Sequence, residues 1–239
     1  MKLSVHNLVK KYPGGFVLDV PELQIAPGES FGLVGNNGAG KTTFLRLILD
    51  LLQATEGTVF SNGKNVAKDE SWKLYIGSYL DEGFIIDFLT PEEFFQFVGT
   101  TYGMSKSRVH EALHRFEAFF NGEVLGKKRK YIRAFSKGNI QKIGIAAAML
   151  SDPSVLVLDE PFANLDPTSQ IVLKKMLRRL HAEKEMTMLI SSHNLNHVVE
   201  ISSRIVLLER GKIVQDIKDI QDHEKVEKQL ESYFSVRES

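Results

Sequence analysis

The sequence predicts an α/β fold with a largely parallel sheet, and three patterns support this prediction. Strand-like and helix-like runs alternate along most of the chain. The runs SVLVLDEP and MTMLISSH are apolar up to their polar ends, which is typical of strands buried on both faces. The run FGLVG ends in glycine and leads into KTTFLRLILDLL, whose apolar residues recur at helical spacing. This order of strand, glycine-rich turn and helix predicts a parallel α/β unit.

The composition excludes several classes of protein. The chain has 239 residues, of which 43% are hydrophobic, as in ordinary globular domains. Its 30 Lys and Arg balance 30 Asp and Glu, so we expect no nucleic-acid partner. The lack of cysteine excludes disulfides, a thiol nucleophile and a thiolate metal site. The sequence has no signal-peptide pattern and no run of about 18 apolar residues, so it predicts no membrane-spanning helix.

The first elements in order are three strands, a helix and a further strand. The strands before the helix are KLSVHNLVKKY, FVLDV and SFGLVG, and the strand after it is GTVFSNG. From about Thr90 to Leu150 helical patterns dominate, with Thr90 as a helix cap and Pro91 at the first helical position. The helices expected in this insertion are EEFFQFVGTTYG and KSRVHEALHRFEAFF.

The second half of the chain returns to alternating strands and helices. PTSQIVLKKMLRRLHAEK and NLNHVVEISS are predicted helices, and RIVLLERGKIVQDI is a predicted hairpin that turns near Arg210 and Gly211. DHEKVEKQLESYF is expected to form a charged helix. We therefore expect a single domain, 1–239, with a core of about 1–84 and 151–215, a helical subdomain of about 85–150 and a helical tail of about 216–239.

The stretch GNNGAGKT matches G-x-x-x-x-G-K-[ST], the pattern of a phosphate-binding loop. Glycines let backbone N–H groups approach a triphosphate, and the following helix adds its positive N-terminal end. Lys41 is expected to reach the β- and γ-phosphates, and the Thr42 hydroxyl to hold Mg²⁺. The expected nucleotide-binding residues are Gly35, Asn36, Asn37, Gly38, Ala39, Gly40, Lys41, Thr42 and Thr43. The alternative, a glycine-rich turn with an incidental lysine, arises by chance in about one such chain in 100.

Three polar residues follow the two buried strands. Asp159 suits Mg²⁺, usually through water, and Glu160 suits the attacking water, as a base or an orienting group. His193 is expected to meet the γ-phosphate, because ligands of such sheets lie beyond the carboxyl ends of the strands. The alternatives are two solvated acids at a strand end and a structural histidine.

The chain resembles the nucleotide-binding subunits of ATP-binding cassette (ABC) transporters, in particular those of bacterial exporters and drug-resistance systems. The resemblance covers residues 2 to about 214 and rests on six motifs in order: KKYPGG, GNNGAGKTT, FSKGNIQK, SVLVLDEP, NLDP and SSH. It implies a P-loop NTPase cassette, with a RecA-like core, N-terminal antiparallel strands and an inserted helical subdomain. It also implies an ATPase that binds ATP and Mg²⁺ and converts ATP and water into ADP and phosphate.

The motif FSKGNIQK resembles the family signature, LSGGQ, and departs from it at Lys137 and Asn139. We interpret Lys137 as a mark of the exporter subtype. The resemblance implies that two ATPase subunits, as a homodimer or a heterodimer, enclose two ATP molecules between them. Ser136 and Gly138 would then contact the ATP of the partner subunit, and Asp166 would belong to a loop that crosses between the two sites.

Of two further positions, one matches the family pattern and one departs from it. Tyr12 matches the aromatic residue that stacks on adenine, although a strand-end tyrosine is the alternative. Asp81 stands where the family usually has a glutamine that contacts Mg²⁺ and the attacking water, unless a shift of the loop puts Glu82 there. Aspartate can ligate Mg²⁺, but it adds a negative charge beside the triphosphate. We therefore expect the Asp81→Gln variant to turn over faster, or to depend less on Mg²⁺.

The resemblance also implies how the ATPase performs work. ATP closes the dimer, hydrolysis reopens it, and the motion drives a separate transmembrane permease, which places the chain at the cytoplasmic face of a membrane. The helical subdomain and the loop before it are expected to form a groove for a permease helix. Phe84 and Phe88 are candidates for its lining, whereas Phe94 and Phe95 are expected in the core. The basic stretch GKKRKYIR is a solvated face or, alternatively, a contact with lipid headgroups.

Two other functions remain open at this point. One is a soluble ABC ATPase that acts on ribosomes or DNA, which the single cassette and the lack of a long heptad run disfavour. The other is a subunit that binds ATP but hardly hydrolyses it. Asp81 is the only support for that function, and Glu160 and His193 argue against it.

Overall fold

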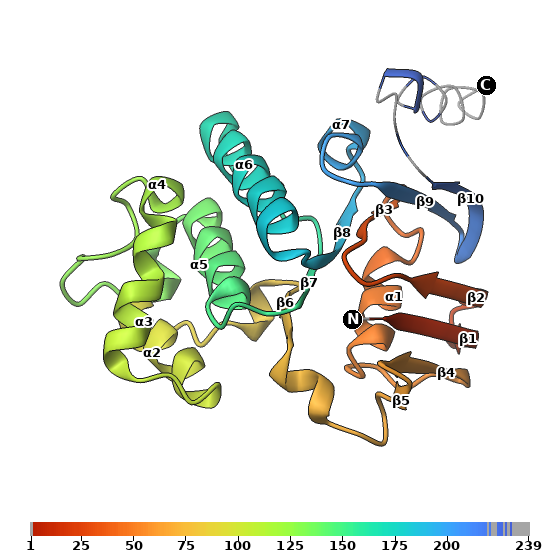
Figure 1. Ribbon diagram of the computed structural model, residues 1–239, viewed down its shortest axis with the longest axis horizontal. Helices are drawn as coiled ribbons and strands as arrows, with labels where there is room; N and C mark the ends of the chain where they lie inside the picture. The colour runs from red at the N-terminus through yellow and green to blue at the C-terminus, as the bar shows by residue number, and fades with distance from the viewer. Residues whose placement is uncertain (1, 219, 221–223, 227, 229, 231–239) are drawn as a thin grey trace.

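The computed structural model describes residues 2–218, 220, 224–226, 228 and 230, and these contain one ten-stranded mixed sheet flanked by helices (Figure 1). Neighbouring strands follow the order β5-β4-β1-β2-β10-β9-β3-β8-β7-β6. The strands are β1 (Leu3–Lys11), β2 (Val17–Ile25), β3 (Ser30–Val34), β4 (Glu56–Ser61), β5 (Lys64–Asn65), β6 (Ile76–Tyr79), β7 (Val155–Leu158), β8 (Thr187–Ser192), β9 (Arg204–Glu209) and β10 (Lys212–Lys218).

The half of the sheet that carries the predicted chemistry is parallel. β3 pairs in parallel with β8 and β9, β8 with β7, and β7 with β6. Along β7, Leu156 and Leu158 belong to one hydrophobic cluster and Val155 and Val157 to another, on the opposite face. Burial on both faces explains the continuous apolar run in the sequence. Because these strands run the same way, the carboxyl ends of β3, β7 and β8 lie at one edge.

The other half of the sheet is mostly antiparallel. β1 pairs with β2 and β4 in antiparallel register, and β10 returns along β9. The β9–β10 hairpin turns at Arg210 (φ 47°) and Gly211 (φ 81°), and two successive left-handed residues are what a two-residue hairpin loop requires. One parallel pairing, Lys212 with Asp19, joins β10 to β2 and so links the two halves.

Residues 2–218 contain seven α-helices, and α2 to α5 form a lobe beside β6 (Figure 1). They are α1 (Lys41–Ile48), α2 (Pro91–Thr101), α3 (Lys106–Leu113), α4 (Glu117–Phe120), α5 (Lys137–Met149), α6 (Pro167–Lys184) and α7 (Leu195–Val199). The predicted start of α2 is correct: Thr90 caps the helix, and Glu93 completes a reciprocal capping box.

The structure differs from the expected helices in two places. KSRVHEALHRFEAFF forms α3 and α4, which are separated by a 3₁₀ turn, η3 (His114–Phe116), and α4 ends at Asn121 in a left-handed conformation. Residues 216–218 of the predicted tail continue β10. Residue 220 lies outside any helix or strand, residues 224–226, 228 and 230 are helical, and the other residues of the tail lie outside the described part of the chain.

The helical lobe and the parallel strands share one hydrophobic core. This cluster joins Phe95, Phe116 and Phe120 of the lobe to Leu156 and Ile190 of the sheet. Phe94 and Phe95 are 5% and 0% exposed, as the sequence predicts. A second cluster packs α1 against the opposite face of the sheet. The subdomain is therefore continuous with the sheet that positions the site.

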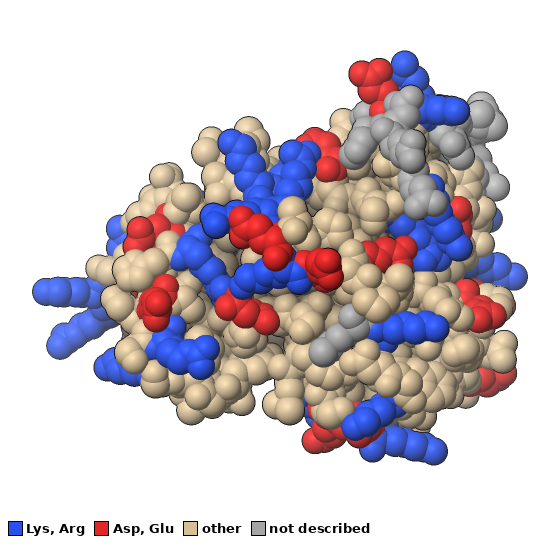
Figure 2. Space-filling model, viewed as in Figure 1, with Lys and Arg blue, Asp and Glu red and all other residues tan. Residues whose placement is uncertain are grey.

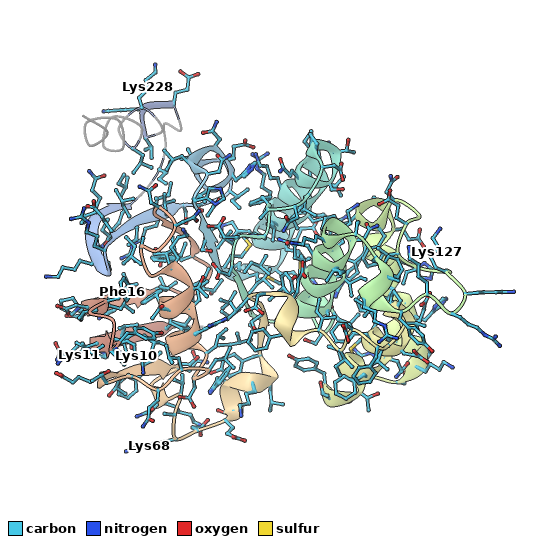
Figure 3. All side chains as sticks on the ribbon, turned by 180° about the vertical axis from the view of Figure 1, so that it is seen from behind. Lys10, Lys11, Phe16, Lys68, Lys127 and Lys228 are labelled. Atoms are coloured by element: carbon cyan, nitrogen blue, oxygen red, sulfur yellow. The ribbon has the colours of Figure 1, made fainter. Side chains whose placement is uncertain are left out.

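Charged side chains are distributed over the outside of the molecule. On the face seen in Figure 2, Lys and Arg are interspersed with Asp and Glu. Lys127, at the outer end of the helical lobe in Figure 3, begins the predicted basic stretch, in which residues 127–130 are exposed. Every helix among the described residues is too short or too polar to cross a bilayer.

Candidate functional site

Three strand ends meet at the candidate site, because β3, β8 and β7 are parallel neighbours. Gly35 follows β3, Asp159 follows β7 and His193 follows β8. The carboxylate of Glu160 lies 3.2 Å from the Lys41 Nζ and 2.9 Å from the His193 Nδ1. The structure thus brings together the phosphate loop, the acids and the histidine that the sequence singles out.

Lys41 is the buried cation of this site. Its side chain is 6% exposed, and Nζ donates hydrogen bonds to the carbonyl oxygens of Gly35 (2.6 Å) and Asn36 (3.3 Å). The loop therefore wraps around the lysine, and Gly40 takes a φ of 108°, which suits glycine. The contact with Glu160 is an ion pair without the alignment of a hydrogen bond. A triphosphate would find this ammonium group already placed at the loop.

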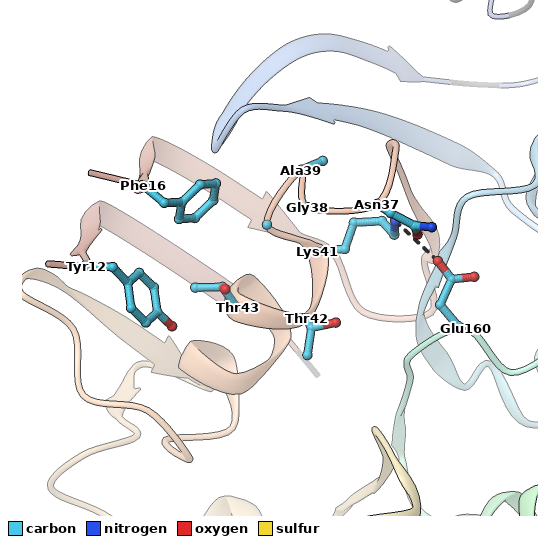
Figure 4. A pocket seen from close by; sticks show the side chains of 10 residues that line it. Tyr12, Phe16, Asn37, Gly38, Ala39, Lys41, Thr42, Thr43 and Glu160 are labelled. Atoms are coloured by element: carbon cyan, nitrogen blue, oxygen red, sulfur yellow. Dashed lines mark ion pairs between the residues drawn. The ribbon is translucent and has the colours of Figure 1, made fainter. Parts of the chain in front are cut away.

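A hollow of about 370 Å³, named the phosphate hollow here, opens over the loop (Figure 4). Tyr12 and Phe16 lie at one end of it and Glu160 at the other. The ring centroids of Tyr12 and Phe16 are 6.1 Å apart, so two aromatic side chains offer apolar surface to the base of a nucleotide. The remaining lining residues are Asn37, Gly38, Ala39, Gly40, Lys41, Thr42 and Thr43.

Thr42 and Asp159 form a pair that suits a magnesium ion. Thr42 Oγ1 donates a hydrogen bond to Asp159 Oδ2 at 2.5 Å, and Ser191 Oγ donates one to Asp159 Oδ1. Burial raises the pKa of Asp159, and the hydrogen bonds from Ser191 and Thr42 oppose this rise. Among the described residues, no group of three or more His, Cys, Asp or Glu is placed to hold a metal by itself. Mg²⁺ keeps several waters and takes phosphate oxygens, so one hydroxyl and one carboxylate fit it.

The backbone of Glu160 is held in a left-handed conformation, with φ at 46°. Its N–H donates to Ser191 Oγ (3.0 Å), and its carbonyl oxygen accepts from Gln141 Nε2 (2.9 Å). Gln141 is 5% exposed, and its Oε1 accepts from Asn164 Nδ2 at 3.4 Å. A strained backbone persists only where its surroundings determine it. Side chains from β8 and α5 thus fix the direction of the candidate catalytic carboxylate.

A second hollow of about 400 Å³, named the acidic hollow here, adjoins the first at Glu160. Its charged lining residues are Asp81, Glu82, Asp159 and Glu160, against the single cation Lys137. The hollow therefore carries an excess of negative charge beside the expected position of the triphosphate.

Asp81 faces this hollow, but both of its carboxylate oxygens are bonded within the chain. Oδ1 accepts from the Gly83 N–H at 2.8 Å, and Oδ2 pairs with the Arg46 guanidinium at 2.9 Å. The expected contact of Asp81 with Mg²⁺ stays a prediction.

Ser136 and Gly138 lie at the start of α5, outside both hollows. Ser136 Oγ caps the helix by accepting from the Asn139 N–H at 3.3 Å. A Cβ on Gly138 would lie 2.6 Å from the Asn164 carbonyl oxygen, so glycine lets that loop pack closely on α5. Asp166, in the same loop, caps α6. The expected contacts of these residues with a partner subunit stay predictions.

Comparisons with known proteins identify the family. The family described as ABC transporter matches residues 18–163. An uncharacterized ABC transporter ATP-binding protein of Bacillus subtilis, YhcH, is 30% identical over 241 residues, covering 99% of this chain and 75% of YhcH. The bacitracin transport ATP-binding protein BcrA of Enterococcus faecalis is 34% identical over 235 residues, covering 96% and 73%.

Solved structures agree with this result. The ATP-binding subunit of an ABC transporter superimposes with a TM-score of 0.81 at 27% identity, over 91% of this chain and 90% of that chain. A dimeric ATP-binding cassette with ADP and Pi, MJ0796, has a TM-score of 0.79 at 23% identity, covering 92% and 99%, and supports the fold alone. The chain belongs to the ABC transporter family, and it is an ATP-binding, ATP-hydrolysing subunit of that family. The predicted family, cassette fold and ATPase activity are confirmed.

Sequence reasoning missed four residues of the site. Phe16 is the aromatic residue before the second strand, and its closeness to Tyr12 in the sequence is a usable signal. Gln141 lies within the motif FSKGNIQK, but its hydrogen bond to the carbonyl oxygen of Glu160 depends on tertiary packing. Ser191 and Arg46 contact their partners only because separate segments meet in the folded chain.

Proposed function

We propose that this chain pairs with a second copy or a close relative, that the two close around two ATP molecules, and that closure moves a separate permease. The observation that carries the proposal is the division of the site. Lys41, Asp159 and Glu160 lie together, whereas Ser136 and Gly138 lie outside both hollows of the same chain. A second chain related by a two-fold axis would supply its signature residues to the first phosphate hollow.

Hydrolysis requires a water molecule to attack the γ-phosphorus of ATP. Glu160 is placed to orient that water or accept its proton, and the bond from the γ-phosphorus to the bridging oxygen breaks to give ADP and phosphate. Lys41 would neutralise charge on the phosphates. His193, whose Nδ1 lies 2.9 Å from the Glu160 carboxylate, would meet the γ-phosphate. Mg²⁺, held by Thr42 and Asp159, would supply further neutralising charge.

The permease would dock where the helical lobe meets the core. The segment that joins β6 to α2 lies at this junction, and its side chains Phe84 and Phe88 are 51% and 63% exposed. Exposed apolar side chains of this kind suit the apolar face of a short permease helix. The chain would then be peripheral, on the cytoplasmic face of the membrane.

Export is the proposed direction of transport. It is supported by Lys137, the subtype mark in the signature, and by the similarity to BcrA, whose name refers to bacitracin transport. Uptake of a labelled cargo into inside-out vesicles, dependent on ATP, would support export, and ATP-dependent loss of cargo from preloaded vesicles would contradict it.

The test of the proposed function is a pull-down from detergent-solubilised source membranes. The tagged Glu160→Gln chain, with ATP and Mg²⁺, should be trapped as a closed dimer and should retain a polytopic membrane protein in near-equal amount. Replacing both Phe84 and Phe88 with serine should remove the membrane protein and leave the ATPase rate of the purified chain unchanged. Recovery of ribosomal proteins or nucleic acid instead would overturn the proposal.

A further inference from the structure

Asp81 and Arg46 connect two segments of the molecule that are far apart in the sequence. Arg46 lies on α1, the helix that begins at Lys41 and closes the phosphate loop. Asp81 follows β6 at the start of the segment that leads to the helical lobe, where its Oδ1 caps the short turn η2 (Glu82–Phe84). The 2.9 Å pair between Arg46 and Asp81 therefore ties this segment to the phosphate-binding helix.

The charges around the acidic hollow explain why such a pair matters there. Asp81 is one of four carboxylates in the lining, and the Arg46 guanidinium is bound directly to it. ATP carries several negative charges of its own, so an uncompensated carboxylate at this edge would weaken ATP binding. The side chains of Arg46 and Asp81 are 43% and 41% exposed, and pairs this open contribute little to folding stability. The main effect of the pair is on the electrostatic field at the site.

The two side chains are also matched in their hydrogen-bonding chemistry. Asp81 uses one oxygen for the Gly83 N–H and the other for Arg46. A glutamine or asparagine amide has one acceptor oxygen and an NH₂ group, so it cannot accept from both donors through separate oxygens. Arg46 Nε is buried without a hydrogen-bond partner, so the position of the guanidinium depends on the bond to Asp81.

From this geometry we propose that Arg46 is a positioning residue of the ATPase, which cancels the charge of Asp81 and fixes that carboxylate at the edge of the acidic hollow. The inference rests on the proposed function, because it takes this hollow to border the triphosphate. It also changes what the sequence alone predicts for Asp81→Gln: since the charge is already compensated, the effect on Mg²⁺ dependence is reduced.

The test is a rescue experiment read by equilibrium binding. ATP binding in EDTA is measured by calorimetry for the unchanged chain, Arg46→Gln, Asp81→Asn and the double variant. Arg46→Gln should weaken binding about three- to tenfold, because one carboxylate is then uncompensated. Asp81→Asn should restore binding in the double variant to within about twofold of the unchanged chain, because the charge to be compensated is gone. Raising the salt concentration should shrink the Arg46→Gln effect.

Two further variants separate charge compensation from a structural role. Arg46→Lys keeps the charge and should bind ATP within about threefold of the unchanged chain. Arg178→Gln is the matched control, because Arg178 pairs with Glu200 at 2.9 Å with 51% and 44% exposure but lines neither hollow. It should leave ATP binding unchanged.

Kinetics provide a second readout that distinguishes the two proposals. Arg46→Gln should raise the KM for ATP by about the same factor as it weakens binding, with kcat changed less than twofold. Equal loss of binding in Arg46→Gln and in the double variant would overturn the role of Arg46. A chain whose phosphate release is insensitive to Glu160→Gln would overturn the hydrolytic role of Glu160, and the binding experiment would still decide the inference about Arg46.

Discussion

The phosphate hollow and the acidic hollow share Glu160, yet they are built in different ways. Most of the phosphate hollow comes from one continuous loop, which encloses a lysine that is 6% exposed. The acidic hollow is assembled from separate segments, which contribute Asp81, Lys137 and Asn164 to its lining. The first hollow has the means to hold a nucleotide by local structure. The second depends on tertiary contacts that aim and balance its charges, so we expect binding and turnover to be separable by mutation.

The largest expected effect comes from the cation of the phosphate hollow. Lys41→Ala should weaken ATP binding and lower the rate of phosphate release, each by about 100-fold or more, because it removes the buried positive charge from the loop. Calorimetry and a phosphate-release assay measure the two losses. Lys11→Ala, in an exposed ion pair with Glu56, is the control. A lysine variant that bound ATP normally would show that the loop does not need its cation.

A smaller loss, of turnover and not of ATP binding, is expected when Gln141 of α5, which lines the acidic hollow, is replaced. Gln141→Leu keeps the size of the side chain but removes the bond to the Glu160 carbonyl oxygen, so the carboxylate loses one of its supports. We expect kcat to fall about tenfold while the KM for ATP stays within about twofold. Gln96→Leu, on α2, is the matched control. An increase in KM without loss of kcat would contradict the distinction between the two hollows.

The smallest effect is expected at the aromatic end of the phosphate hollow. Tyr12→Ala should weaken ATP binding about three- to tenfold through lost stacking, whereas Tyr12→Phe should change it less than twofold. Phe16→Ala, measured in the same titration, shows how much the neighbouring ring contributes. If Phe16→Ala weakens binding and Tyr12→Ala does not, the stacking residue is Phe16 and the expectation for Tyr12 is wrong.

The difference between the hollows also explains what the sequence could predict. A phosphate loop needs a fixed order of glycines, lysine and threonine, so Gly35 to Thr43 are recognisable without the fold. The positions of Asp159 and His193 at strand ends were predictable because each follows an apolar run that is typical of a strand buried on both faces. Gln141 and Arg46 have no such local signature, since each acts on a residue from another segment.

The errors in the fold have a similar physical cause. The break between α3 and α4 went unpredicted because the apolar residues on either side of it keep helical spacing, and Phe116 remains fully buried through the 3₁₀ turn. Burial constrains which side chains point inward, but it does not fix the hydrogen-bond pattern of the backbone within one turn.

The continuous core of the helical lobe limits how this subunit can move. Phe95 and Phe120 of the lobe belong to the same buried hydrophobic cluster as Leu156 and Ile190 of the sheet. A hinge that swung the lobe away as a rigid body would expose those side chains to water. Sliding of packed layers past one another preserves the contacts. We therefore expect the motion that the subunit transmits to a permease to be a small sliding of the lobe against the sheet, limited by the packing of these side chains.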